Sequence, residues 1–140
     1  MKVKELMTTS VTCVRPNTPL SQIAKYMKQE NIGALPVCTD RGEPVGIITD
    51  RDIVLRAMTD PGKEKTAQDI MTKNLVHAHP EMNTHEASML LAKHQIRRLP
   101  VVENNKLVGM LAMADIARKP IYVDEAGDAL NAISKPSTLN

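Results

Sequence analysis

The stretch Gly46-Ile47-Ile48-Thr49-Asp50-Arg51-Asp52-Ile53 decides how the rest of the chain is interpreted. The run from Val45 to Ile48 is apolar and β-branched, which is typical of a buried strand. Thr49 and Asp52 have the spacing of a capping box, in which a hydroxyl and a carboxylate accept free backbone N–H groups at the start of a helix. The stretch therefore predicts a strand that turns directly into a helix from Asp52 to about Met58. Such turns often bind phosphorylated ligands in α/β folds, but a helix cap without a ligand is the alternative interpretation.

The same outline recurs 63 positions later, in Val108-Gly109-Met110-Leu111-Ala112-Met113-Ala114-Asp115-Ile116. Upstream, matching landmarks lie 64 positions apart: Met7-Thr8 and Met71-Thr72, Pro16 and Pro80, Leu35-Pro36-Val37 and Leu99-Pro100-Val101. A repeat of this length indicates one supersecondary unit that is used twice.

Each unit has the order strand, helix, strand, strand, helix (β-α-β-β-α), which predicts an α/β (α+β) fold. The expected first strands are Val11–Val14 and Leu75–Ala78. We expect unit 1 at residues 1–60, a linker at 61–66, unit 2 at 67–120 and a tail at 121–140. The tail segment from Asp124 to Ile133 is compatible with one short helix.

Composition restricts the possible functions of this chain of 140 residues. A unit of about 60 residues is marginal alone, so we expect the two units to pack face to face. The net charge of +2 is too small to imply nucleic acid or an anionic membrane, and without Phe or Trp there are few aromatic platforms for bases. No stretch approaches the roughly 20 apolar residues that span a bilayer, and the N-terminus lacks the apolar core of a signal peptide. We therefore expect a cytoplasmic protein without nucleic-acid or membrane partners, whose cysteines are reduced by default.

The order of elements, the repeated Leu-Pro-Val and the Gly-x-x-x-x-x-Asp-Ile pattern together resemble the cystathionine-β-synthase (CBS) domain. The resemblance covers residues 3–120. It is closest to small stand-alone bacterial pairs, including the hypoxic-response kind, in residues 11–14 (Val-Thr-Cys-Val), 32–38 (Ile-Gly-Ala-Leu-Pro-Val-Cys) and 107–109 (Leu-Val-Gly). It implies a tandem pair of units related by a pseudo-two-fold axis. It also implies a regulatory module that binds an adenosine-containing ligand in the cleft between units, and a homodimer.

The resemblance also assigns roles to particular residues. In CBS modules the aspartate of the Gly-x-x-[ST]-x-x-Asp motif accepts hydrogen bonds from the two ribose hydroxyls, and Asp52 and Asp115 match it. A carboxylate suits this role because both of its oxygens are acceptors only. Thr49 matches the hydroxyl position, whereas Ala112 replaces it in the second unit, so we expect the cap to be lost there and the two clefts to be unequal. A carboxylate favoured only by the helix dipole is the alternative.

Phosphate binding would require cations, and the family's phosphate-binding positions match Arg97 and Arg98. Adjacent strand residues point to opposite faces, so regular geometry directs at most one of them into a cleft, and Arg98 is the better candidate. The first unit has Gly33 and Ala34 at these positions. Two arginines in solvent are the alternative interpretation.

Adenine would lie between aliphatic side chains and would be recognised by backbone groups of the two expected first strands, which contain Val14 and Ala78.

Cys13 and Cys38 are expected on neighbouring strands. Three interpretations are open: inert buried thiols, a disulfide that forms on oxidation, or a Cys/His metal site. No C-x-x-C or H-x-x-x-H spacing supports the metal, so we expect no metal site.

The sequence contains no nucleophile elbow, phosphate-binding P-loop or zinc signature, so we expect neither enzymatic activity nor a cofactor. The leading hypothesis is a sensor of AMP, ADP, ATP or S-adenosylmethionine, with the adenine nucleotide as a regulatory ligand. The rival is a protein-interaction or redox/stress-response adaptor with vestigial clefts and an unidentified protein partner. The uncharged Gly33-Ala34 and the substitution at Ala112 favour this rival.

Overall fold

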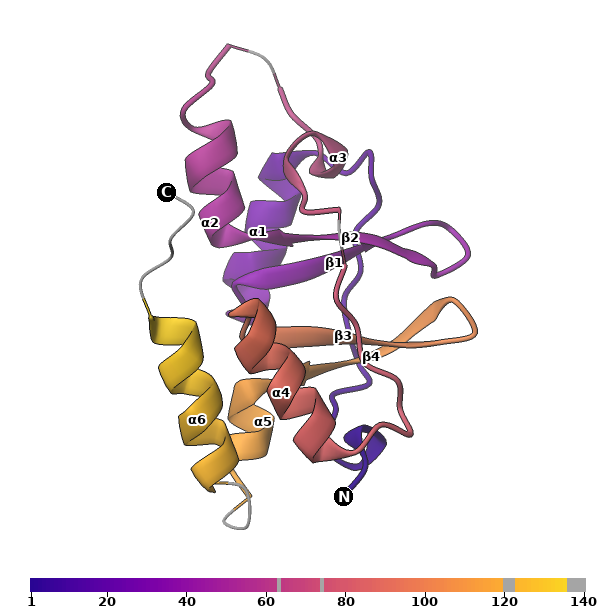
Figure 1. Ribbon diagram of the computed structural model, residues 1–140. Helices are drawn as coiled ribbons and strands as arrows, with labels where there is room; N and C mark the ends of the chain where they lie inside the picture. The colour runs from indigo at the N-terminus through magenta and orange to yellow at the C-terminus, as the bar shows by residue number, and fades with distance from the viewer. Residues whose placement is uncertain (63, 74, 120–122, 136–140) are drawn as a thin grey trace. The chain divides into compact units, whose positions relative to one another are not determined.

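The computed structural model describes residues 1–62, 64–73, 75–119 and 123–135, with the backbone alone for 123–125 (Figure 1). The elements are η1 (Val3–Glu5), α1 (Leu20–Glu30), β1 (Ala34–Cys38), β2 (Pro44–Thr49), α2 (Asp50–Asp52), η2 (Ile53–Ala57), α3 (Ala67–Ile70), α4 (Thr84–His94), β3 (Arg98–Glu103), β4 (Lys106–Ala112), α5 (Met113–Ala117) and α6 (Val123–Ser134). In the described part of the chain the strands form two small sheets, β1-β2 and β3-β4. The predicted α/β (α+β) class is therefore confirmed. Helix α6 lies where the sequence predicts a short helix, and residues 121, 122 and 136–140 of the expected tail lie outside the described residues.

Two compact units make up the fold, and they differ from the repeats of the sequence. The first-repeat unit consists of Thr12–Leu75 with Asn105–Leu107, and the second-repeat unit consists of Met1–Val11, Val76–Asn104 and Val108–Asn140. The segment that opens each repeat, residues 1–11 or 67–75 and called here the lead-in segment, therefore packs with the other repeat.

The first-repeat unit is built around the antiparallel pair β1-β2, in which Leu35 pairs with Ile48. Helix α1 contributes the buried Ile23 and Met27 to the same cluster of apolar side chains. Burial of such side chains contributes about 1.5–3 kcal/mol each, which is the main source of stability in a unit of this size. The buried members of this cluster are Val14, Ile23, Met27, Leu35, Val37, Ile48, Ala67 and Ile70.

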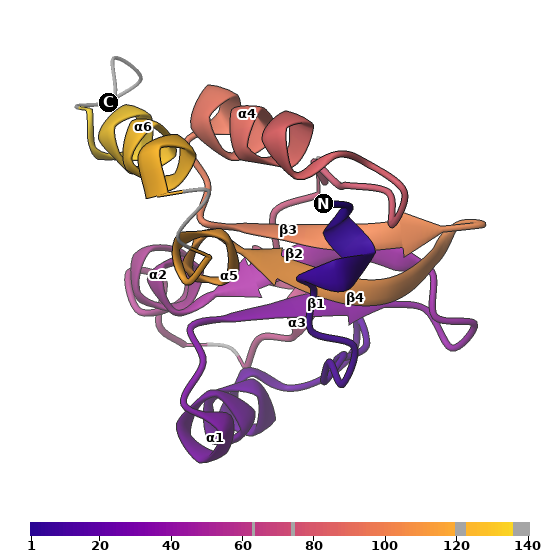
Figure 2. The ribbon, with the colours of Figure 1, turned by 90° about the horizontal axis from the view of Figure 1, so that it is seen from below.

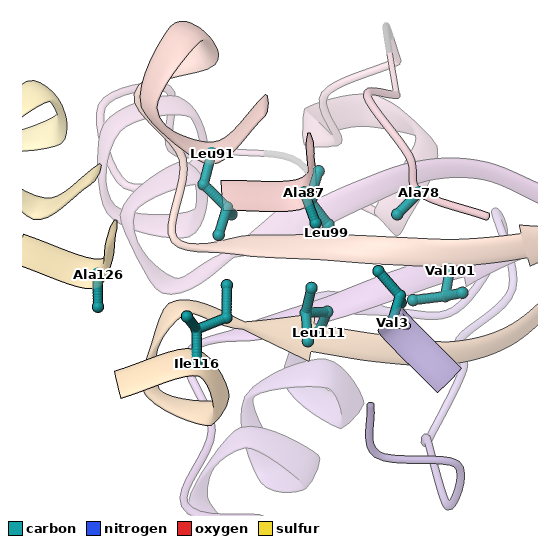
Figure 3. Packing of buried hydrophobic residues seen from close by; sticks show 9 residues of the cluster. All are labelled: Val3, Ala78, Ala87, Leu91, Leu99, Val101, Leu111, Ile116 and Ala126. Atoms are coloured by element: carbon teal, nitrogen blue, oxygen red, sulfur yellow. The ribbon is translucent and has the colours of Figure 1, made fainter. Parts of the chain in front are cut away.

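The second-repeat unit has the corresponding cluster, to which Val3 of the N-terminal segment belongs (Figure 3). Strands β3 and β4 are joined through Asn104 and Asn105, whose φ angles of 53° and 63° are typical of the type I′ hairpin turn. Helix α6 lies against α4 and α5 (Figures 1 and 2). There it buries Ala126 and Ala129.

Each lead-in segment forms one antiparallel bridge with the second strand of a hairpin, Thr8 with Met110 of β4 and Thr72 with Ile47 of β2. Thr8 and Met110 exchange two backbone hydrogen bonds of 2.9 Å, and Thr72 and Ile47 exchange bonds of 2.9 and 3.0 Å. The strand residue beside each pairing is a glycine, because any side chain there would come too close to the backbone of the lead-in segment. A Cβ at Gly46 would lie 2.9 Å from the Thr72 carbonyl oxygen. A Cβ at Gly109 would lie 2.9 Å from the carbonyl oxygen of Thr8 in the same way. The repeated glycine therefore allows the close approach of the lead-in backbone.

The expected first strand of each unit is much shorter than predicted. In the described residues, Val11–Val14 pairs with β1 through one parallel bridge, Val14 to Val37, and Leu75–Ala78 pairs with β3 only through Ala78 and Val101. Pro16 and Pro80 follow these bridges by two residues, and proline has no N–H with which to continue a ladder. Each segment therefore leaves the sheet after a single pairing.

Candidate ligand-binding site

The capping box predicted at Thr49 and Asp52 is present. The Asp52 N–H donates to Thr49 Oγ1 at 3.0 Å, and the Thr49 N–H donates to Asp52 Oδ2 at 3.0 Å. The predicted start of the helix at Asp52 is wrong, because Thr49 is the N-cap and the first helical residue is Asp50. The helix then continues as the π-helix η2, where the Met58 N–H donates to the Ile53 carbonyl at 3.1 Å. Single π turns of this kind are frequent at functional sites.

The Asp52 carboxylate is held in one orientation and is largely shielded. Its side chain is 14% exposed, and Oδ1 lies 3.9 Å from Arg56 Nε. The same guanidinium donates to the Ile70 carbonyl at 3.0 Å, so it links η2 to α3. Each carboxylate oxygen has two lone pairs, so Asp52 retains acceptor capacity after forming the cap. Arg56 was not predicted as a site residue, although the i,i+4 spacing from Asp52 indicates a possible ion pair.

The corresponding turn of the second repeat retains half of the cap. The Ala112 N–H donates to Asp115 Oδ2 at 2.8 Å, and the Asp115 side chain is 13% exposed. Arg118 Nη2 lies 3.4 Å from Asp115 Oδ1. The expectation that the cap is lost at Ala112 was therefore too strong: the hydroxyl is missing, but the carboxylate still accepts the N–H because that bond needs only backbone at position 112.

Arg98 opens strand β3, Arg97 directly precedes it, and the backbone of Arg97 lies beside the start of α5. Arg98 is the half-buried first residue of β3, and Arg97 is exposed. The Met113 N–H donates to the Arg97 carbonyl at 2.9 Å, which holds this segment at the same end of α5 as Asp115.

The equivalent position of the first-repeat unit has the opposite charge. The Asp50 N–H donates to the Gly33 carbonyl at 2.9 Å, as Met113 does to Arg97. A Cβ at Gly33 would lie 3.0 Å from Asp50 Oδ2, so a carboxylate occupies the space beside this glycine. Asp50 was not predicted as part of the site, although it precedes Asp52 by only two residues. The first-repeat unit thus has the Asp50 carboxylate beside the position that corresponds to Arg97 in the second repeat.

The backbone groups of Val14 and Ala78 are already used within the fold. The Val14 N–H donates to Pro36 at 3.0 Å, and its carbonyl accepts from Cys38 at 2.8 Å. Ala78 makes the same two bonds, to Pro100 and from Val102, both of 2.8 Å. At these two residues only the second lone pair of each carbonyl is left for a ligand.

The structure divides the expected site residues between the two compact units. Thr49, Asp52, Val14, Cys13 and Cys38 belong to the first-repeat unit, and Asp115, Arg97, Arg98 and Ala78 belong to the second-repeat unit.

The two thiols of the first-repeat unit are in contact, with the Sγ atoms of Cys13 and Cys38 3.4 Å apart. The hydrogen bond from Cys38 lowers the pKa of Cys13 to about 7, and the same contact raises the pKa of Cys38. Among the described residues no group of three or more His, Cys, Asp or Glu side chains could hold a metal ion. None of the helices in that part of the chain is long and apolar enough to cross a membrane.

This chain belongs to the CBS-domain family, whose sequence profile matches residues 3–58 and 67–122. The CBS domain-containing protein YhcV of Bacillus subtilis is 44% identical over 133 residues, which are 94% of each chain. Hypoxic response protein 1 of Mycobacterium tuberculosis is 36% identical over 118 residues, which are 82% of each chain.

Solved structures show the same fold. Hypoxic Response Protein I, crystallised with two coordinated zinc ions, has a TM-score of 0.76 at 34% identity and covers 84% of this chain and 98% of its own. The CBS domain pair of protein MJ0100, in complex with 5′-methylthioadenosine and S-adenosyl-L-methionine, has a TM-score of 0.76 at 30% identity and covers 84% of this chain and 94% of its own. The predicted resemblance to tandem CBS pairs, including hypoxic-response proteins, is therefore confirmed.

Proposed function

We propose that this chain is a non-catalytic regulatory module that binds an adenosine-containing ligand, of the AMP, ADP, ATP or S-adenosylmethionine class. The observation that carries the proposal is the pair of shielded carboxylates, Asp52 and Asp115, each fixed by a backbone N–H at the start of a helix. A carboxylate held in this way meets two ribose hydroxyls without reorganising. The relative MJ0100, whose domain pair holds two adenosine derivatives, supports this ligand class.

The charged residues near the two turns favour different substituents on an adenosine-containing ligand. In the first-repeat turn Asp50 and Asp52 are balanced by Arg51 and by Arg56, whose Nε lies 3.9 Å from Asp52 Oδ1. This turn therefore has no excess of positive charge for phosphate and suits a neutral or cationic substituent such as a sulfonium. Arg97 and Arg98 beside Asp115 favour phosphate, since guanidinium groups bind phosphate with charge-assisted hydrogen bonds. We therefore propose that the two turns contribute unequally, and we favour one strong site per chain.

Calorimetric titration with adenosine, AMP, ADP, ATP and S-adenosylmethionine tests the proposal. We expect at least one of them to bind with a micromolar Kd, about −8 kcal/mol. One ligand per chain would support a single strong site, and two ligands of equal affinity would contradict the inequality. If none of the five ligands binds, the sensing function is wrong.

We also propose that the chain acts as a homodimer. Val54, Leu55 and Met58 of the α2–η2 region are 57%, 52% and 71% exposed, and Val54 and Leu55 line a shallow hollow of about 420 Å³. In the second-repeat unit the corresponding helix α5 has α6 packed against it, and the positions that match Val54 and Leu55 hold Ala117 and Arg118, neither of which is a large apolar residue. One repeat thus has its helical face covered by the chain itself, and a second copy is the simplest cover for the other.

Light scattering tests the dimer, with an expected mass of twice the 15.4 kDa of one chain. Leu55→Asp should shift the mass toward the monomer. Met89→Asp on α4, which also replaces an exposed methionine (58%), should not. A wild-type monomer at micromolar concentration would refute the proposal.

The rival function, a protein-interaction or redox adaptor with vestigial clefts, is favoured by the same exposed apolar residues and by the facing thiols. We propose a cytoplasmic location for either function, where reduced thiols are the ordinary state. Failure of all five ligands together with a stable monomer would favour the adaptor, because the apolar face would then be open to a different protein.

A further inference from the structure

The facing thiols of Cys13 and Cys38 lie on segments that are fixed to each other. The Val14 N–H donates to Pro36 and the Cys38 N–H donates to Val14, so backbone bonds of 3.0 and 2.8 Å hold the two cysteine-bearing segments together. The Sγ–Sγ distance of 3.4 Å exceeds a disulfide bond by about 1.4 Å, which small χ1 rotations of the two side chains can close.

The two thiols differ in access and in proton affinity. Cys38 is fully buried, whereas Cys13 is partly exposed. The Cys38 thiol donates its hydrogen bond to Cys13, and the Arg15 guanidinium, itself paired with Asp40 at 3.0 Å, adds positive charge near both sulfurs. Cys13 is therefore the more accessible thiol and the more readily ionised one near neutral pH, whereas Cys38 keeps its proton.

The second repeat shows whether the fold needs cysteines at these two positions. The positions that correspond to Cys13 and Cys38 hold His77 and Val102, yet the bridge between Ala78 and Val101 forms as the bridge between Val14 and Val37 does. The repeat fold thus does not require a thiol at either position, so packing alone does not explain the pair.

We propose that Cys13 and Cys38 form a reversible dithiol–disulfide pair that exchanges with low-molecular-weight disulfides, with Cys13 as the attacking thiolate and Cys38 as the resolving thiol. In the first step the Cys13 thiolate attacks a sulfur of the small disulfide, a mixed disulfide forms on Cys13, and one small thiolate leaves. In the second step Cys38 attacks the Cys13 sulfur, the second small thiolate leaves, and the Cys38 proton passes to a departing thiolate. The protein loses two electrons and the small disulfide gains them.

The disulfide would close a loop around α1, because its ends, 25 positions apart, bracket Leu20–Glu30. Oxidation therefore constrains the segment that leads into β1 without adding any group to the protein.

Glutathione disulfide is a suitable probe of the full chain. Under mixtures of oxidised and reduced glutathione, we expect intact mass spectrometry to show the loss of two hydrogens and peptide mapping to join Cys13 to Cys38. Excess reduced glutathione should reverse both. Oxidation that only links separate chains, or no loss of hydrogen at any glutathione ratio, would overturn the proposal.

Single variants test the assigned order of attack. Cys38→Ser should accumulate glutathione on Cys13, because the resolving thiol is missing. Cys13→Ser should remain largely unmodified while folded, since Cys38 is buried, and its rate of glutathione capture should be at least about tenfold lower. Equal capture by both variants would refute the roles given to the two thiols. Circular dichroism shows whether each variant is folded. If a variant does not fold, the alkylation rates of Cys13 and Cys38 in the wild type provide the same test. Cys13 should react faster than Cys38 in the native protein, and the difference should disappear on denaturation.

Discussion

Replacing Asp52 should separate its structural role from its role in ligand binding. Asp52→Ala removes the acceptor for the Thr49 N–H, a bond of 3.0 Å, and removes negative charge from the N-terminal end of the helix. Lost caps and lost dipole interactions of this kind cost about 1–2 kcal/mol of stability. If the carboxylate also accepts two ribose hydroxyls, the variant should lose about 2–3 kcal/mol of binding free energy, or roughly 30- to 150-fold in Kd.

A second capping carboxylate in the same unit provides the matched control. Asp69 accepts from the Thr66 N–H at 2.8 Å at the start of α3, but it does not follow a strand and is not a proposed ligand residue. Asp69→Ala should therefore lower stability by a similar amount and leave affinity unchanged. Asp52→Asn, which keeps one oxygen for the cap, should retain much of the stability and still bind weakly.

The assay combines urea denaturation with calorimetry of the tightest of the five ligands. Calorimetry is carried out without denaturant, where a loss of 1–2 kcal/mol still leaves a protein with about 5–15 kcal/mol of stability almost fully folded. If Asp52→Ala and Asp69→Ala lose stability alike and both bind like the wild type, Asp52 is only a helix cap and the reasoning about ribose fails.

Three further predictions follow from particular contacts. Gly46→Ala should destabilise the protein by about 1–3 kcal/mol, because its Cβ meets a backbone oxygen of the lead-in segment. Gly127→Ala should stabilise the protein by up to about 1 kcal/mol, because a Cβ there has open space and alanine is the better helix former. Equal urea midpoints for the two variants would contradict this. Arg98→Ala should weaken AMP, ADP and ATP far more than adenosine in calorimetric titration, and equal losses would place Arg98 away from phosphate. The pKa of Glu81 is lowered from 4.5 to about 2 by two lysines of the N-terminal segment, so its contribution to stability should be present above about pH 4.5 and lost as the pH falls toward 2. Glu81→Gln should flatten that part of the stability profile, by a small amount since the ion pairs are exposed, and an unchanged profile would show that they contribute nothing.

The hairpin strands and the cap at Thr49 could be predicted because their signals are local, whereas the first strand of each unit shrinks to a single bridge. The run from Val45 to Ile48 is apolar and β-branched, and it lies within β2. The spacing of Thr49 and Asp52 specified the cap, which the structure contains. The π-helix after Asp52 was not predicted, because residues suited to an α-helix do not reveal a change to an i→i+5 ladder.

The exchange of the lead-in segments could not be predicted for a different reason. Met7-Thr8 and Met71-Thr72 carry the same two residue types, and Gly46 and Gly109 offer each of them the same space. Side-chain complementarity is thus equal for both pairings. The choice depends on chain path, which the pattern of residue types does not encode.

The repeats also show what the carboxylates need from their surroundings. Asp115 accepts its backbone N–H at 2.8 Å with Ala112 at the N-cap, so the hydroxyl of Thr49 is not required to position the matching carboxylate. That hydroxyl accepts the Asp52 N–H and still has a proton to donate, which a ligand acceptor could use. Each carboxylate also has one arginine of its own helical region nearby, Arg56 for Asp52 and Arg118 for Asp115. The halves therefore differ in the Thr49 hydroxyl and Asp50 of the first repeat and in Arg97 and Arg98 of the second. Because Arg97 and Arg98 attract phosphate and Asp50 repels it, we expect affinity to depend more strongly on phosphate at Arg98 than at Thr49.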